Sequence, residues 1–275
     1  MNEEILNQDI VNEITALKQE KDAVILAHYY VRPEVQAIAD YIGDSFYLSK
    51  VAANLDAKTI VFAGVFFMGE SAKVLNPGKT VLLPDMKADC AMAHMADVAT
   101  IQKMRETYDD LAVVCYINST AELKQHSDVC VTSSNAVKIV KALPNKNIFF
   151  IPDRNLARYV AAQVPEKNFV FNEGYCPIHE QILMNELHEV KAAHPQALVL
   201  AHPECKKELL DEVVKIPGVY IPQFYDVTYD KEGHVLAVTP NHPDAPATIY
   251  KRVLKHMDNA FFPENPIVPY MDVIH

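Results

Sequence analysis

The sequence predicts an α/β protein built from successive units, each with a parallel sheet covered by helices. Two observations predict this class. Apolar runs typical of strands alternate with helical patterns along the 275 residues. The apolar runs are also nearly continuous, which is typical of parallel strands that are buried on both faces.

The elements can be assigned in order from these patterns. The expected strands are 24–30, 59–68, 80–85, 111–118, 129–134, 147–153, 169–176 and 197–204. The expected helices are 33–42, 70–75, 121–126, 135–143, 155–164, 179–194 and 205–215. After them, 227–238 predicts a hairpin with its turn at Lys231–Gly233, because a glycine-containing turn separates two strand-like runs.

A repeat of about 86 residues appears when the strand ends are compared. Asn118 follows His28 by 90 residues, His202 follows Asn118 by 84, and Cys176 follows Cys90 by 86. Three such units account for the length better than one large sheet. We therefore expect a first αβα unit over 1–98, a second over 99–185 and a third over 186–275.

Composition narrows the function classes. The 25 Lys and Arg against 36 Asp and Glu give a net charge of −11, which argues against binding to nucleic acid or to an anionic membrane. The N-terminus has no apolar signal core, and apolar runs such as 59–68 are far shorter than the ~20 residues of a membrane span. We expect a cytoplasmic protein whose five widely spaced cysteines serve as thiols, metal ligands or catalysts.

Common catalytic motifs are absent from the sequence. There is no GxGxxG, and GVFFMGES has Glu70 where a phosphate-binding loop needs lysine, so its carboxylate would repel phosphate. The HExxH, CxxC and GxSxG motifs are missing as well. A nucleotide loop, a helical zinc site, a redox dithiol and the common hydrolase elbow are therefore not supported.

Three polar tripeptides, at 28–30, 116–118 and 202–204, each end an expected strand. Parallel sheets bind ligands at the carboxyl ends of their strands. Equivalent clusters would converge on one cleft, where histidine, tyrosine and glutamate could supply acid–base chemistry to a small polar substrate. The alternative for any single one of them is a packed core residue.

Hydroxyl groups recur at two expected helix starts, at Ser45 and Ser133. A helix N-terminus attracts phosphate or carboxylate through its unpaired N–H groups and its dipole. Either serine alone would be explained by helix capping. Their recurrence at matching positions of the repeat favours ligand binding.

The cysteines fall into two groups. Cys115 and Cys130 lie within expected strands and Cys205 in the first turn of an expected helix, so we interpret them as structural. Cys90 and Cys176 follow strand ends in expected loops, where an iron–sulfur cluster could bind. Two thiolates are too few for an ordinary cluster, and the repeat predicts a third near position 262, which is phenylalanine.

Several segments together resemble the quinolinate synthase family from about residue 10 to about residue 216. They are ILAHYYVRPEVQAIADYIGDS, IVFAGVFFMGESAKVLNPGKTVLLPD, YINSTAELK, VTSSNAVKIV, GYCPIHE and LAHPEC. The resemblance implies a pseudo-threefold arrangement of three-layer αβα domains, with the third domain of this chain incomplete or atypical. It also implies a [4Fe–4S] cluster that is held by three cysteines and has one open iron.

The resemblance further implies an activity in de novo NAD biosynthesis. Iminosuccinate (iminoaspartate) and dihydroxyacetone phosphate condense to quinolinate, with a functional link to L-aspartate oxidase. Cys90 and Cys176 would be metal ligands, and Tyr30, His202 and Glu204 would transfer protons. The implied substrate-binding residues are His28, Ser45, Tyr116, Ile117, Asn118, Ser133, His179 and Pro203.

The resemblance stops near residue 217, where composition also changes. Residues 217–275 hold 8 prolines in 59 residues, against 9 in the preceding 216. This tail is similar to the stretch before the catalytic core of an uncharacterised radical-SAM family, without its CxxxCxxC. We interpret the tail as the product of a fusion or frameshift, with natural divergence as the alternative. Two functions stay open: a quinolinate synthase, or an inactive or impaired truncated or chimeric homologue that at most binds a small dicarboxylate or phosphate.

Overall fold

The computed structural model describes residues 8–194, 199, 201–216, 219–221, 224–230 and 234–249. The chain divides into two compact units, and each is described by itself. The first contains the described residues up to 94 together with 117–125, and the second contains 95–116 and the described residues from 126 onward. Within the described part of the chain, every helix is too short or too polar to cross a membrane.

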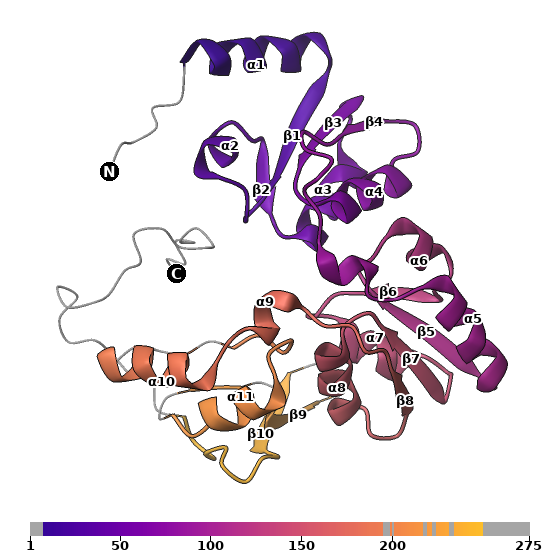
Figure 1. Ribbon diagram of the computed structural model, residues 1–275, viewed down its shortest axis with the longest axis vertical. Coiled ribbons are helices and arrows are strands. Elements are labelled where there is room, and N and C mark those ends of the chain that lie inside the picture. Colours follow the sequence, from indigo (N-terminus) through magenta and orange to yellow (C-terminus); the bar gives the residue numbers. More distant parts are fainter. Residues whose placement is uncertain are drawn as a thin grey trace. The chain divides into compact units, whose positions relative to one another are not determined.

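The first unit is a four-stranded parallel sheet with the strand order β2-β1-β3-β4 (Figure 1). Its strands are β1 (Ala23–His28), β2 (Tyr41–Gly43), β3 (Thr59–Ala63) and β4 (Thr80–Leu82). Its helices are α1 (Gln8–Glu20), α2 (Pro33–Ala37), α3 (Ser45–Asn54), α4 (Phe66–Leu75), the 3₁₀ helix η1 (Ala91–His94) and α6 (Ala121–Gln125). Buried apolar side chains from β1, β3, α3 and α4 form one core, so the sheet packs on these helices.

The second unit repeats this topology with the strand order β6-β5-β7-β8, again all parallel. Its strands are β5 (Leu111–Tyr116), β6 (Val129–Val131), β7 (Asn147–Ile151) and β8 (Asn168–Phe171). Helices α5 (Val98–Thr107), α7 (Ala136–Ala142) and α8 (Arg154–Gln163) accompany them. All six residues of β5 are buried, as expected for a central strand with both faces covered. The predicted α/β class is confirmed.

The two sheets match residue by residue at a spacing of 88. Asp22 and Asp110 precede β1 and β5 with positive φ angles of 46° and 52°. The carboxylate of Asp40 accepts a hydrogen bond from the third residue of β1, and the carboxylate of Asp128 accepts the same bond in β5, both at 2.7 Å. This register aligns His28 with Tyr116, because they pair with Gly43 and Val131 respectively. The alignment of His28 with Asn118 at the strand ends was therefore wrong by two residues.

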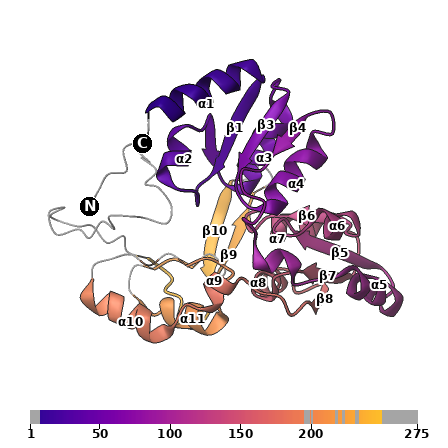
Figure 2. The same ribbon diagram turned by 45° about the horizontal axis from the view of Figure 1, so that its top comes forward.

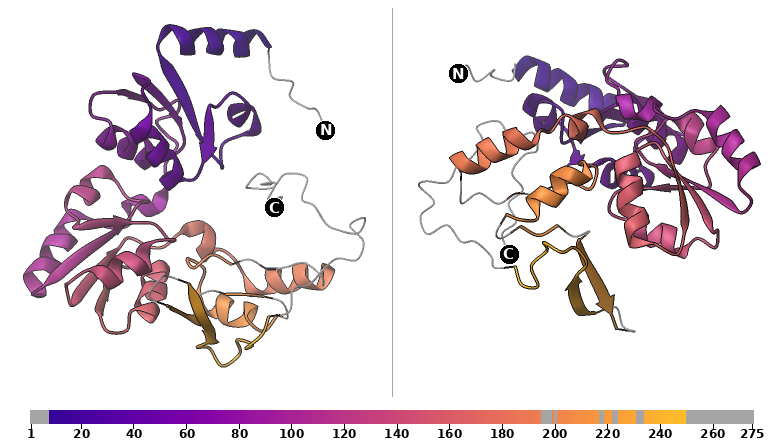
Figure 3. Two further views of the ribbon diagram at one scale, coloured as in Figure 1. Left: turned by 180° about the vertical axis from the view of Figure 1, so that it is seen from behind. Right: turned by 60° about the horizontal axis from the view of Figure 1, so that its bottom comes forward.

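The later part of the second unit contains two short helices, a longer one and a hairpin. In chain order they are the short helix α9 (Pro177–Glu180), the longer helix α10 (Met184–Ala193) and the short helix α11 (Lys207–Val213). The hairpin is the antiparallel pair β9 (Tyr225–Tyr229) and β10 (Val235–Pro240). Figure 2 shows the two strands of the hairpin side by side, and Figure 3 shows α10 and α11 in two further views. The predicted hairpin is confirmed, while its turn at 231–233 lies outside the described residues.

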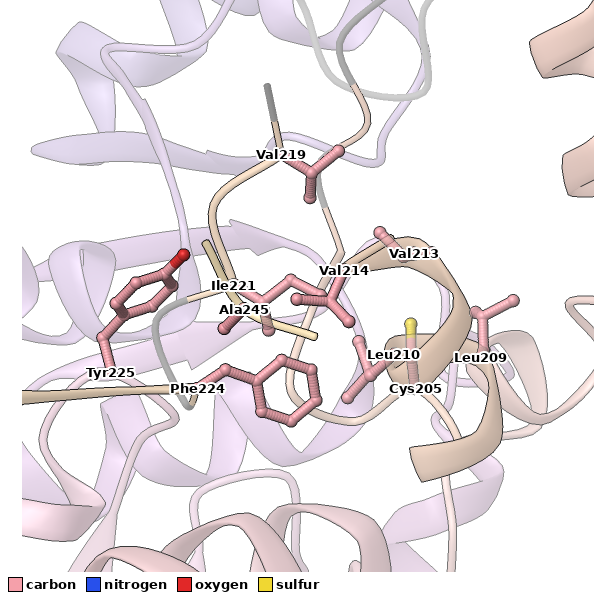
Figure 4. Close-up of a cluster of buried hydrophobic side chains, with 10 residues drawn as sticks. All are labelled: Cys205, Leu209, Leu210, Val213, Val214, Val219, Ile221, Phe224, Tyr225 and Ala245. Carbon is pink, nitrogen blue, oxygen red and sulfur yellow. The ribbon is translucent and has the colours of Figure 1, made fainter. Parts of the chain in front are cut away.

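A hydrophobic core joins α11 to the proline-rich tail (Figure 4). Leu209, Leu210 and Val213 of α11 pack with Phe224 and Ala245 from the tail. Residues before and after position 217, where the family resemblance stops, therefore share one buried cluster.

Some predicted boundaries were wrong. The expected helix 33–42 ends at Ala37, and strand β2 follows at Tyr41–Gly43. The expected strand 59–68 ends at Ala63, since α4 begins at Phe66, and periodicity cannot separate a buried strand from a buried helix start. The stretch 179–194 contains two helices instead of one. Of the expected strand 197–204, residues 197, 198 and 200 lie outside the described residues, and 201–204 are not in a strand.

Candidate metal and substrate site

The candidate site lies where the strands of the second sheet end. Tyr116 is the last residue of β5, and Asp153 lies two residues after the end of β7. Cys176 lies beyond β8, immediately before α9. Because the strands are parallel, these carboxyl ends share one edge of the sheet, the usual place for a ligand in such folds.

Cys176, His179 and Glu204 form a group that could hold a metal ion. The ligand atom that each offers lies within 4.8 Å of the other two. Cys176 and His179 are half-buried, and Glu204 is only 2% exposed. Within the described residues, Oε1 of Glu204 is buried without a hydrogen-bond partner. A buried carboxylate oxygen normally has a hydrogen-bond partner. An oxygen without one suits a residue that binds a metal ion.

His179 and Glu204 form an ion pair, with Nδ1 and Oε2 3.0 Å apart. Burial alone lowers the pKa of His179, but the contacts and charges of Cys176 and Glu204 outweigh burial and raise it to about 10. Burial raises the pKa of Glu204, yet His179, His202 and Tyr116 lower it below its usual value overall. The protein without metal therefore holds a charged imidazolium beside a carboxylate at neutral pH.

His202 is a second histidine that lies beside this group, and its pKa is shifted in the opposite direction from that of His179. Its ring stacks on that of His179, with the centroids 5.0 Å apart and the planes 15° apart. Burial lowers its pKa, Glu204 raises it less, and the charge of His179 lowers it further. Nδ1 of His202 accepts the backbone N–H of Glu204 at 3.3 Å. The site thus pairs a charged histidine with a neutral one, which separates an acid from a base.

Tyr116 contributes a buried phenol at the end of β5. Burial, and then the charge of Glu204, raise its pKa well above the usual value of 10.0. The hydroxyl therefore keeps its proton and can donate it in a hydrogen bond at neutral pH. Pro203 is half-buried between His202 and Glu204, which agrees with its expected place in the site segment.

Three consecutive residues that were not predicted from the sequence support this site. Asp153 is completely buried, and burial raises the pKa of its carboxyl to about 6. Arg154 pairs with Glu180 at 3.0 Å, and the side-chain amide of Asn155 donates to the backbone carbonyl of Glu204 at 3.1 Å. The available signal was a polar run immediately after the apolar stretch NIFFIP, at the carboxyl end of a parallel strand.

Other predicted site residues belong to the first unit. His28 ends β1, is 7% exposed, and has a pKa lowered by burial and partly restored by Asp44. Tyr30 follows it, is 71% exposed, and stacks edge-on against the ring of His28 at 4.5 Å. Ile117 and Asn118, both half-buried, also belong to this unit. Their roles in substrate binding and proton transfer stay predictions.

Ser45 and Ser133 are not helix caps. The cap of α3 is Asp44, whose carboxylate accepts the N–H of Tyr47 at 2.7 Å, and Ser45 is the first helical residue. The cap of α7 is Asn135, two residues after Ser133. Because the capping explanation fails at both positions, ligand binding by these half-buried serines stays open as a prediction.

Burial supports the structural interpretation of Cys115 and Cys205, although Cys205 precedes α11 and does not lie in its first turn, whereas the burial expected of Cys130 was wrong. Cys115 is buried within β5, and Cys205 is 4% exposed in the core that α11 shares with the tail. Cys130 is exposed on the edge strand β6. Cys90 and Cys176 are both half-buried in loops just before short helices, and none of the five forms a disulfide.

The loops of Cys90 and Cys176 are held to their sheets by the same backbone contact. The N–H of Phe66 donates to the carbonyl of Ala88 at 2.8 Å, and the N–H of Arg154 donates to Gly174 at 2.8 Å. Phe66 and Arg154 are the first residues of α4 and α8, and each carbonyl lies two residues before the cysteine. Cys90 and Cys176 therefore occupy equivalent positions in the two units, each considered separately.

The fold and the Cys/His/Glu group define an α/β protein with a candidate metal site at the strand ends of a repeated unit. The chain belongs to the family described as Quinolinate synthetase A protein, whose model matches residues 12–219. The quinolinate synthase of Fusobacterium nucleatum subsp. nucleatum is 59% identical over 200 residues, which cover 73% of this chain and 67% of the relative. That of Clostridioides difficile is 52% identical over 206 residues, covering 75% and 68%. The family resemblance is confirmed, and the matched region ends close to where the sequence composition changes.

Proposed function

We propose that this chain is a quinolinate synthase of de novo NAD biosynthesis. It condenses iminosuccinate with dihydroxyacetone phosphate to quinolinate, with release of phosphate and two molecules of water. The observation that carries the proposal is the group of Cys176, His179 and Glu204 at the strand ends of a chain that belongs to this family. L-aspartate oxidase would supply the iminosuccinate. We also propose a cytoplasmic reaction with small-molecule partners only, since the net charge of −11 argues against nucleic acid or an anionic membrane as a partner.

The implied cofactor is a [4Fe–4S] cluster, and the thiols fit it in part. Cys90 and Cys176 lie in equivalent loops, are half-buried, and are the candidate ligands. Cys205 does not fit, because its side chain is packed in a hydrophobic core. The third cysteine that the family resemblance implies would follow residue 216, and the sequence has none there. A third ligand from this chain would therefore be an oxygen or nitrogen atom, or the third coordination would come from outside the protein.

When bound, an iron with an open position would act as a Lewis acid toward a substrate hydroxyl or carboxylate. The side chains supply the remaining chemistry. If Cys90 and Cys176 hold the iron and His179 does not, the imidazole of His179 would instead bind a substrate carboxylate through a charge-assisted hydrogen bond. Neutral His202 could accept a proton, and the phenol of Tyr116 could donate a hydrogen bond to a developing negative charge.

Binding of the two anionic substrates would also use the helix starts. Ser45 opens α3, where the helix dipole favours phosphate or carboxylate, although Asp44 already accepts the N–H of Tyr47 at this helix start. Ser133 occupies the equivalent position in the second unit, before the cap of α7. We propose that His28, Tyr30, Ile117 and Asn118, all in the first unit, also bind substrate.

Anaerobic purification with iron and sulfide analysis tests the proposal. Protein made with ample iron should contain both elements, and Cys176→Ser and Cys90→Ser should lose most of them. Cys130→Ser is the matched control, because this thiol is exposed on β6, at the opposite edge of the second sheet from β8 and the Cys176 loop that follows it. Equal iron content in all three variants would contradict the ligand assignment.

Quinolinate production then tests the activity itself. The wild-type protein should form quinolinate from dihydroxyacetone phosphate and iminosuccinate generated in place by L-aspartate oxidase. Iron-containing protein without quinolinate formation would support the alternative of an impaired homologue that binds only a small dicarboxylate or phosphate. Protein lacking both iron and sulfide would overturn the proposed function.

A further inference from the structure

Two residues at the start of α8, the cap Asp153 and the first helical residue Arg154, hold the loop that carries Cys176. Asp153 is completely buried, and its two carboxylate oxygens have different partners. Oδ1 accepts the N–H of Leu156 at 2.6 Å and so caps α8. Oδ2 accepts the N–H of Cys176 at 2.9 Å. One carboxylate thus connects the start of a helix to the backbone of the candidate ligand.

Arg154 contacts the same loop along most of its length. Its backbone N–H donates to Gly174, and its Nη1 donates to the carbonyl of Glu173 at 3.2 Å. Its Nη2 donates to Glu180 Oε1 at 3.0 Å, and its guanidinium lies 4.7 Å from the ring centre of Tyr175. Guanidinium groups suit such a task, since they present several donors in a fixed plane and also stack on aromatic rings.

The first unit shows that the fold does not require this arrangement. Val65 occupies the cap position of α4 that Asp153 occupies in α8, and it makes no side-chain hydrogen bond there. Phe66 stands where the second unit has Arg154 and keeps only the backbone bond to Ala88. The N–H of Cys90 instead donates to the carboxylate of its neighbour Asp89 at 2.8 Å. A buried carboxylate and a guanidinium are therefore additions specific to the second unit.

Asp153 and Arg154 contact the segment that contains two of the three candidate metal ligands, Cys176 and His179. Cys176 precedes α9, and His179 lies within this helix of only four residues. So short a helix is not stable by itself. Contacts to Cys176 and Glu180 hold the two ends of the segment that contains His179.

We propose that Asp153 and Arg154 are positioning residues that hold Cys176 and His179 in their ligand-binding arrangement before any metal binds. The identity of the metal group rests on the proposed function, but the ordering of the loop does not. Helix capping alone is the competing explanation for Asp153. It predicts no effect on the loop when the cap is preserved.

Matched substitutions separate the two explanations. Asparagine caps helices about as well as aspartate, so Asp153→Asn can keep one acceptor for α8 while losing the second for Cys176. Asp97→Asn makes the same change at the exposed cap of α5, where the carboxylate accepts the N–H of Thr100. Arg154→Gln is matched by Arg105→Gln, since Arg105 also holds a carboxylate and a backbone carbonyl in the second unit.

Two measurements are made on each variant. Hydrogen–deuterium exchange of metal-free protein should be at least tenfold faster over 173–180 in Asp153→Asn and Arg154→Gln, and unchanged in that segment in both controls. Iron content after anaerobic reconstitution should fall below half of wild type in the same two variants. Urea denaturation identifies any variant that is globally unfolded. Arg154→Lys keeps the charge but not the planar set of donors. We expect it to change exchange over 173–180 and iron content in the same direction as Arg154→Gln, but less.

Exchange and iron content that match wild type in both variants would overturn the inference. Faster exchange spread evenly over the whole second unit would also overturn it, because that result indicates a general loss of stability. Wild-type protein that takes up no iron would overturn the proposed function instead. In that case the exchange measurement still decides whether Asp153 and Arg154 order the loop.

Discussion

Replacing Gly174 by alanine should disturb the site without touching any candidate ligand. Gly174 lies two residues before Cys176, and its carbonyl accepts the N–H of Arg154. An added Cβ would lie 2.5 Å from the carbonyl oxygen of Pro152, 2.8 Å from Cβ of Met95 and 2.9 Å from Nδ2 of Asn172. These neighbours are themselves fixed, because the amide of Asn172 donates to the carbonyls of both Pro152 and Met95 at 2.8 Å.

The size of the effect follows from these distances. Carbon atoms in favourable contact are about 3.5–4.0 Å apart, so the loop must move away from β7 by roughly 1 Å. Overpacking of this kind costs about 1–3 kcal/mol. The bond between Gly174 and Arg154 must also weaken, which places our expectation at about 3 kcal/mol. For a protein of this size that corresponds to a fall in Tm of roughly 6–12 °C.

Urea and thermal denaturation provide the assay, with Gly78→Ala as the matched control. A Cβ at Gly78 meets no atom within 4 Å, so that variant should be neutral or more stable by up to about 1 kcal/mol. Gly174→Ala should also bind less iron than Gly78→Ala after reconstitution. Equal stability and equal iron content in the two variants would refute the reasoning.

Three further predictions concern charge and packing. Glu204→Gln removes a carboxylate 3.0 Å from His179, an attraction of about 6 kcal/mol at an effective dielectric constant of about 20, or roughly 4 pKa units. NMR titration of the metal-free variant should show the pKa of His179 falling by several units from about 10, and a value that stays near 10 would contradict the pairing. Burial lowers the pKa of His28 from 6.5, so the folded state resists its protonation and the free energy of unfolding should fall as pH drops below 6.5. In His28→Gln that slope should be smaller, and an identical slope in urea titrations at pH 7.5 and 5.5 would argue against it. Phe150→Ala, at a fully buried position of β7, should cost about 3–5 kcal/mol, and a loss under 1 kcal/mol by urea denaturation would be inconsistent with this core.

The alternation of strands and helices was predictable because apolar residues repeat with the period of each element. The central strand β5, apolar at nearly every position, is the clearest case. Boundaries failed where apolar character continued from one element into the next. Phe66 and Phe67 extend the apolar run of β3, although they begin α4, and nothing in periodicity marks the change.

The candidate site was predictable in its residue types but not in its supports. Cys176, His179 and Glu204 were identified from strand ends, loop position and family resemblance, and the structure brings these three together. Asp153 was missed because its significance lies in a contact with a residue 23 positions later. Such a partner becomes visible only when strands β7 and β8 are paired. The offset of 88 residues between equivalent strands was not recognised in the sequence, because the two cysteines, which were used to measure the repeat, are 86 residues apart.

The matching ladders of the two sheets are what tandem duplication of one ancestral βα module produces. Residues that serve only the backbone, such as Asp40 and Asp128, were kept in both copies. At the cap positions of α4 and α8 the two copies differ, with Val65 in the first unit and Asp153 in the second. The protein thus contains its own comparison, because the first unit holds its cysteine loop to α4 by the backbone bond alone, while the second unit has the same bond together with the contacts of Asp153 and Arg154.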